Sequence, residues 1–113
     1  MKNILVTGGS GFIGSNIALE LQSHLPEARI TVLEDFRSSS FKNLLGLKGD
    51  LLAFDCSDKA WMSWAKGKKL DIIYHMAAIT DTTILDEQKM MFDNVEGFRN
   101  ILDLAVEKKA AVV

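Results

Sequence analysis

Glycines near the start of the chain are spaced so that their backbone could bind a phosphate group. They stand in Thr7-Gly8-Gly9-Ser10-Gly11-Phe12-Ile13-Gly14, which contains the pattern Gly9-x-Gly11-x-x-Gly14. A short apolar run precedes this segment, and apolar residues at helical spacing follow it. Glu34 ends the next apolar run and stands 20 positions after Gly14 (34 − 14 = 20). This is the arrangement of a dinucleotide-binding fingerprint.

The chemistry explains the residue types. A pyrophosphate carries negative charge and is attracted to the free backbone N–H groups at a helix N-terminus. A side chain at Gly11 would block that approach, and Gly14 allows the helix to lie close to the first strand. Glu34 could accept hydrogen bonds from the adenosine ribose. The alternative interpretation is a tight strand-to-helix turn that binds no ligand.

The rest of the chain alternates between strand and helix patterns. Expected strands are 4–7, 30–33, 51–54, 71–75 and 110–113, and expected helices are 12–25, 58–66 (with Ser57 or Asp58 as the cap) and 86–109. Such alternation predicts an α/β Rossmann-like, doubly wound parallel sheet of order 3-2-1-4-5. We expect residues 1–113 to form one NAD(P)-binding domain.

Helical spacing also predicts which helix faces point inward. In the second helix these are Trp61, Trp64 and Ala65. In the long helix the predicted inner face is formed by Met91, Val95, Phe98, Leu102, Ala105 and Val106.

Composition narrows the classes of function. The chain has 113 residues and a net charge of −2, which gives no support for a nucleic-acid or anionic-membrane surface. One cysteine, Cys56, forms neither an internal disulfide nor a thiol-rich zinc site, and no metal site is expected. No apolar stretch is long enough for a signal peptide or a membrane span. These features favour a cytoplasmic setting.

The segment from Thr7 to Asn16 resembles the opening of the extended short-chain dehydrogenases, the family of nucleotide-sugar epimerases and dehydratases. Asp55, His75-Met76-Ala77-Ala78 and Asn94-Val95-x-Gly97-x-x-Asn100 resemble further segments of that family. Leu33 to Ser38, Phe41 to Leu44 and His75 to Thr83 narrow the resemblance to the branch that epimerises nucleotide-linked heptoses for lipopolysaccharide. The resemblance spans nearly the whole chain.

The resemblance implies a role for particular residues. Asp55 would contact adenine, the His75 segment would lie along the cofactor, and Asn94 would make a structural or active-site hydrogen bond. The predicted cofactor-binding residues are Gly8, Gly11, Phe12, Ile13, Gly14, Glu34, Asp35, Arg37, Asp55, Cys56, Lys59, Met76, Ala77, Ala78 and Asn94. The substrate-side candidates are Thr80, Asp81, Thr82 and Thr83, for which a polar surface loop is the alternative.

Two of these side chains also have a plainer interpretation. We expect Cys56 to be a small buried filler beside the adenine pocket, and not a nucleophile. His75 ends a buried strand, so we expect a hydrogen-bonded core group in preference to a catalytic base.

The residues expected near the adenosine ribose give conflicting indications about whether the cofactor is NAD or NADP. Glu34 and Asp35 favour the free 2′-hydroxyl of NAD, whereas Arg37 could pair with the 2′-phosphate of NADP. The heptose branch favours NADP, so NADP is the prediction and NAD the alternative.

The family's acid/base group is a Tyr-x-x-x-Lys pair with a nearby Ser or Thr. The only tyrosine here is Tyr74, and the residue four places on is Ala78. In the family those catalytic groups follow the fifth strand, so the resemblance implies the N-terminal part of a longer, homo-oligomeric enzyme with no catalytic residue before Val113. A remaining C-terminal part would bind the nucleotide sugar. The alternatives are a UDP-sugar epimerase, a dTDP-sugar dehydratase, or a catalytically silent NAD(P)-sensing module.

Overall fold

The computed structural model describes residues 2–8, 12–35, 45–76 and 87–113. The strands are β1 (Asn3–Thr7), β2 (Arg29–Leu33), β3 (Asp50–Leu52), β4 (Ile72–His75) and β5 (Ala111–Val112). The helices are α1 (Phe12–His24), the 3₁₀ helix η2 (Lys59–Ala65) and α2 (Glu87–Lys108).

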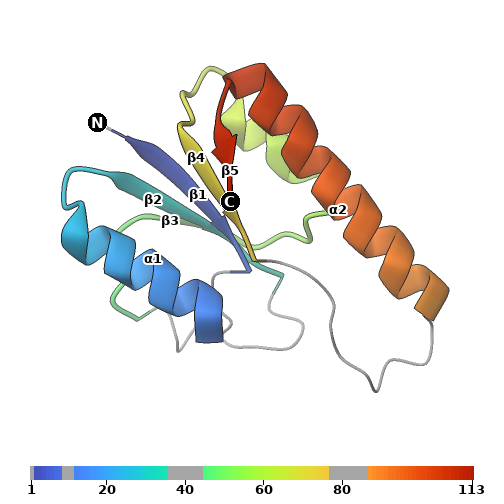
Figure 1. Cartoon of the computed structure of the whole chain (residues 1–113), viewed down its shortest axis with the longest axis horizontal. Helices are drawn as coiled ribbons and strands as arrows, with labels where there is room; N and C mark the ends of the chain where they lie inside the picture. Colours follow the sequence, from blue (N-terminus) through green and yellow to red (C-terminus); the bar gives the residue numbers. More distant parts are fainter. Residues whose placement is uncertain (1, 9–11, 36–44, 77–86) are drawn as a thin grey trace.

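The strands form one parallel sheet of order β3-β2-β1-β4-β5. This confirms the predicted Rossmann-like topology and strand order. Helix α1 covers one face of the sheet, and α2 together with η2 covers the other (Figure 1). Within the described residues, neither α-helix is long and apolar enough to cross a membrane.

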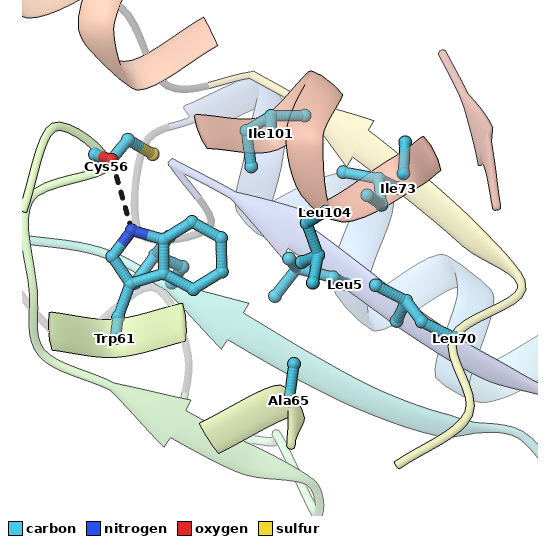
Figure 2. Packing of buried hydrophobic residues seen from close by; sticks show 10 residues of the cluster. Leu5, Cys56, Trp61, Ala65, Leu70, Ile73, Ile101 and Leu104 are labelled. Carbon is cyan, nitrogen blue, oxygen red and sulfur yellow. Dashed lines mark hydrogen bonds between the residues drawn. The ribbon is translucent and has the colours of Figure 1, made fainter. Parts of the chain in front are cut away.

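Alternation along the central strands builds a core on each face of the sheet. Ile4 and Val6 of β1 pack with Ala18 of α1, whereas Leu5 packs with Trp61 and Leu104 on the opposite face. Figure 2 shows the second cluster, in which Trp61 lies between η2 and the sheet. Because both faces are covered, β1 is apolar from Ile4 to Val6 without a polar interruption.

The third strand is shorter than predicted. It ends at Leu52, and Phe54 is exposed, although the sequence predicted a strand through Phe54. The strand β3 lies at the edge of the sheet and pairs only with β2, where Leu33 opposes Leu52. Because β2 ends at Leu33, the ladder has no partner for residues beyond Leu52.

The predicted inner face of α2 is wrong at four of its positions. Val95, Phe98, Leu102 and Val106 are exposed; Ala105 is buried as predicted, and the side chain of Met91 lies outside the described residues. The buried positions are instead Gly97, Asn100, Ile101, Leu104 and Ala105. Two apolar stripes run along this helix, and the sheet covers only the one that carries Ile101 and Leu104.

The predicted inner face of η2 is mostly confirmed. Trp61 and Ala65 are buried and Trp64 is half-buried. Asp58, one of the two predicted caps, is the N-cap of η2, and its Oδ1 accepts from the amide of Ala60 at 2.9 Å.

Candidate dinucleotide site

The candidate site lies at the carboxyl ends of the parallel strands. Because the strands run in one direction, the residues after β1, β2, β3 and β4 meet at one edge of the sheet. The sequence-predicted residues Gly8, Glu34, Asp55 and Met76 follow these strands in turn. The fold therefore brings together residues that are up to 68 positions apart in the sequence (76 − 8 = 68).

The first loop begins in a conformation that suits glycine. Gly8 has a φ of 68°, and its N–H donates to the carbonyl of Leu33 at 2.8 Å. Gly14 and Ser15 are buried in the first turns of α1. The first turn of α1 has no acidic residue, so no carboxylate of its own competes for the positive end of the helix dipole. Gly9 to Gly11 lie outside the described residues, as do the side chains of Phe12 and Ile13.

The charges of three carboxylates act on a buried thiol at this edge. Burial, as the largest cause, and the negative charges of Asp55, Asp35 and Glu34 together raise the pKa of Cys56 to about 12, although a hydrogen bond from Thr7 acts in the opposite direction. A thiol with this pKa is protonated at neutral pH and is a poor nucleophile. Cys56 is 8% exposed, which agrees with its predicted role as a buried filler.

Asp55 has a fixed orientation. Its Oδ1 accepts hydrogen bonds from the amide and the hydroxyl of Ser57, each at 3.0 Å, and its carbonyl accepts from the amide of Asp58 at 2.9 Å. Glu34 is held by its backbone, since its amide donates to the carbonyl of Leu52 at 2.9 Å. The two acidic residues thus stand on adjacent, hydrogen-bonded segments.

His75 joins β4 to β1 and to α2. Its Nδ1 lies 2.8 Å from Oγ1 of Thr7, and its ring stacks on Phe98 with centroids 5.5 Å apart and an interplanar angle of 12°. Burial lowers the pKa of His75 below its usual value, so the ring is neutral at neutral pH. These contacts agree with a hydrogen-bonded, partly buried group.

The lowered pKa of His75 predicts a pH-dependent stability. In the unfolded chain the ring takes up a proton near pH 6.5, whereas the folded protein resists protonation until a lower pH. The free energy of unfolding should therefore fall as the pH drops below about 6.5, until the folded-state pKa is reached. Urea unfolding between about pH 5 and 7.5 measures this slope, and His75→Asn should flatten it. An identical slope for the wild-type protein and His75→Asn would contradict the assignment.

The remaining predicted residues divide into two groups. Met76 is exposed, with its amide donating to the carbonyl of Thr7 at 3.2 Å; Lys59 begins η2, and Asn94 is half-buried on α2. Arg37, Ala77, Ala78, Thr80, Asp81, Thr82 and Thr83 lie outside the described residues.

Two polar residues at this edge were not predicted as functional. Thr7 ends an apolar strand and is fully buried, and Asn100 is fully buried on α2. Both residues are polar at positions where the surrounding pattern predicts an apolar side chain. That departure from the pattern could have identified them. In the described part of the chain, no cluster of His, Cys, Asp and Glu could hold a metal ion.

The arrangement has the elements of a ligand-binding site, and among the residues described at this edge we identify no group placed for proton transfer. Tyr74 lies within β4 as one of the half-buried residues packed against the α1-side core. A left-handed glycine, a helix start and an acidic side chain after the neighbouring strand are the elements that hold a diphosphate and its adjoining ribose.

Comparison with known proteins gives a consistent result. Residues 4–113 match the model of the family described as "NAD dependent epimerase/dehydratase family". The chain is 36% identical over 109 residues to ADP-L-glycero-D-manno-heptose-6-epimerase of Brachyspira hyodysenteriae, with 94% of this chain and 34% of that protein covered. It is 30% identical over 115 residues to dTDP-D-glucose 4,6-dehydratase of Dictyostelium discoideum, with 91% and 26% covered.

A solved structure shows the same fold. The crystal structure of ADP-L-glycero-D-manno-heptose-6-epimerase from Helicobacter pylori superimposes with a TM-score of 0.87 at 38% identity. The match covers 98% of this chain and 37% of that chain. The present chain thus spans about a third of the length of the two heptose epimerases and about a quarter of that of the dehydratase.

Proposed function

Because the chain belongs to the NAD-dependent epimerase/dehydratase family, we propose that it is the dinucleotide-binding part of a nucleotide-sugar epimerase. The observation that carries the proposal is the meeting, at one sheet edge, of the left-handed Gly8 turn with Glu34 and Asp55. When bound, the cofactor would accept and return a hydride at the sugar. The protein's part in this chain is to hold and orient that cofactor.

The carboxylates have separate tasks in this proposal. Glu34 accepts hydrogen bonds from the adenosine ribose, because it directly follows β2 next to the Gly8 turn. Asp55 faces the adenine ring, with its carboxylate oriented by Ser57. Met76 and the residues after it lie along the cofactor.

For the cofactor we favour NAD, with NADP as the alternative. Glu34, Asp35 and Asp55 gather negative charge at the edge of the site, and a 2′-phosphate would be repelled there. The family description names NAD. NADP, which the resemblance to the heptose branch favoured and whose 2′-phosphate could pair with Arg37, stays a prediction.

For the sugar we propose an ADP-linked heptose, supported by two heptose epimerases at 36% and 38% identity. A dTDP-sugar dehydratase is the second candidate, supported by a relative at 30% identity. In either enzyme the acid/base groups and most of the sugar pocket would come from a segment that this chain does not contain. For the intact enzyme we also propose a homo-oligomer. Absence of turnover by an intact protein that binds NAD would favour the sensing module.

Calorimetric titration of the chain with NAD and with NADP tests the proposal. Glu34→Ala should weaken NAD binding by about tenfold, since it removes a charge-assisted hydrogen bond. The same substitution should weaken NADP binding less, because it also removes a repulsive charge. Glu107→Ala, which changes an exposed acid in the last turn of α2, is the matched control. Failure to bind either dinucleotide, or equal losses in both variants, would contradict the proposal.

A further inference from the structure

Helix α2 holds the turn that carries Asp55. The carbonyl oxygen of Cys56, the next residue, accepts two buried hydrogen bonds: Nε1 of Trp61 donates at 3.1 Å and Nδ2 of Asn100 at 2.8 Å. Figure 2 shows the first of these bonds, with Ile101 of α2 on the far side of the indole ring from η2. The bond from Asn100 is the only one of the two that connects the turn to α2, across 44 positions of sequence.

The backbone of α2 also approaches this turn closely. A Cβ added at Gly97 would lie 3.0 Å from Cβ of Cys56 and 3.7 Å from the amide nitrogen of Ser57. Gly97 and Asn100 are three positions apart and therefore on the same side of the helix. One stripe of α2 thus both touches the turn and donates a hydrogen bond to it.

Burial of the polar side chain of Asn100 is unfavourable in free energy. Its side chain is fully buried, and its Oδ1 has no hydrogen-bond partner in the described structure. An unsatisfied buried acceptor destabilises a fold, so an apolar side chain of similar size would cost less at this position. The hydrogen bond that Nδ2 donates to the carbonyl of Cys56 compensates for part of this unfavourable free energy.

We propose that Asn100, with Gly97, positions Asp55 and thereby sets the affinity of the site for the adenosine half of its ligand. The inference rests on the proposed dinucleotide function. Asn100 holds the Cys56 carbonyl in place through its hydrogen bond. The adjoining Asp55 is then held in the turn, where its Oδ1 accepts a hydrogen bond from the amide of Ser57 at 3.0 Å. Asn100 itself is a positioning residue, since it acts through the turn.

The decisive variant is Asn100→Leu, which keeps the number and branching of the heavy atoms in the side chain and removes the donor. Its affinity for AMP should fall by about tenfold, whereas its affinity for nicotinamide mononucleotide should stay within about twofold of wild type. In the ligand-free protein, hydrogen exchange at the Ser57 amide should be about tenfold faster, because the turn opens more often. A merely structural role would change the melting temperature and leave the ratio of the two affinities unchanged.

A second variant covers the case in which Asn100→Leu does not fold. Gly97→Ala favours the helix but pushes against Cys56, so it should also weaken AMP binding selectively. Gly46→Ala is the matched control, because its added Cβ meets only Leu19 Cδ2 at 3.7 Å. Unchanged AMP affinity and unchanged Ser57 exchange in the folded variants would overturn the inference. If wild type binds neither AMP nor NAD, the proposed function fails, and the exchange rate at Ser57 alone decides whether α2 holds the turn.

Discussion

Replacing Gly49 with alanine is expected to destabilise the fold by about 2–4 kcal/mol, because the added methyl group would clash with the backbone of β2. An added Cβ would lie 1.7 Å from the carbonyl oxygen of Ile30 and 2.8 Å from its carbonyl carbon. Both atoms belong to the backbone of β2, which is held between β1 and β3 and cannot rotate away. The edge strand β3 would have to shift, and its pairing with β2 would weaken. Urea unfolding of the two proteins measures the difference.

Gly46→Ala provides the comparison for this prediction. It makes the same chemical change three positions earlier, where the added Cβ makes only an ordinary van der Waals contact. We expect a change in the free energy of unfolding within about 0.5 kcal/mol, as for most surface substitutions. Similar losses in both variants would show that the close approach at Gly49 is not the cause.

Trp61→Ala is expected to cost about 3–5 kcal/mol, the range measured for large aromatic residues in protein cores. Trp61 is 1% exposed and packs in the cluster that contains Leu5, Ile73 and Leu104 (Figure 2). The substitution also removes the hydrogen bond to the carbonyl of Cys56. Thermal and urea unfolding measure the loss.

Trp64→Ala is the control for Trp61. Trp64 lies one turn later in η2 but is only half-buried, with Lys68 Nζ 4.7 Å from its ring centroid. Its Nε1 has no hydrogen-bond partner in the described residues, so its removal forfeits no such bond. We expect the loss to be less than half of that for Trp61→Ala. Equal losses would show that the two indoles share the core equally.

The strands could be predicted because each of them has the same kind of local sequence pattern. Short apolar runs between glycines and helices predict buried parallel strands, and right-handed crossovers then leave few possible strand orders. The ends of the strands were harder to predict from the sequence. The strand β3 ends where β2 ends, and the length of β2 is not encoded near Leu52.

The position of the candidate site in the fold was predictable to the extent that its residues follow strands. Gly8, Glu34 and Asp55 each come directly after a strand or close to one, so the carboxyl edge collects them whatever the details of the packing. Asn100 could not be found this way. It sits in the middle of a helix, and its role depends on a carbonyl 44 positions earlier.

The face of α2 shows the same limit in another form. Phe98 and Leu102 have the spacing of a core stripe, yet both are exposed, and Ile101 and Leu104 are buried in their place. Periodicity reports that a helix has an apolar stripe, but it does not report which stripe a sheet will cover when there are two.

The amino-acid sequence by itself determined the order of strands and helices and the parallel order of the sheet, because each follows from neighbouring residues and chain direction. Only the tertiary structure decided which side of α2 faces inward and which buried donors fix the Cys56 carbonyl. Those contacts join segments that are distant in sequence, and their geometry depends on how closely Gly97 lets the helix approach the turn.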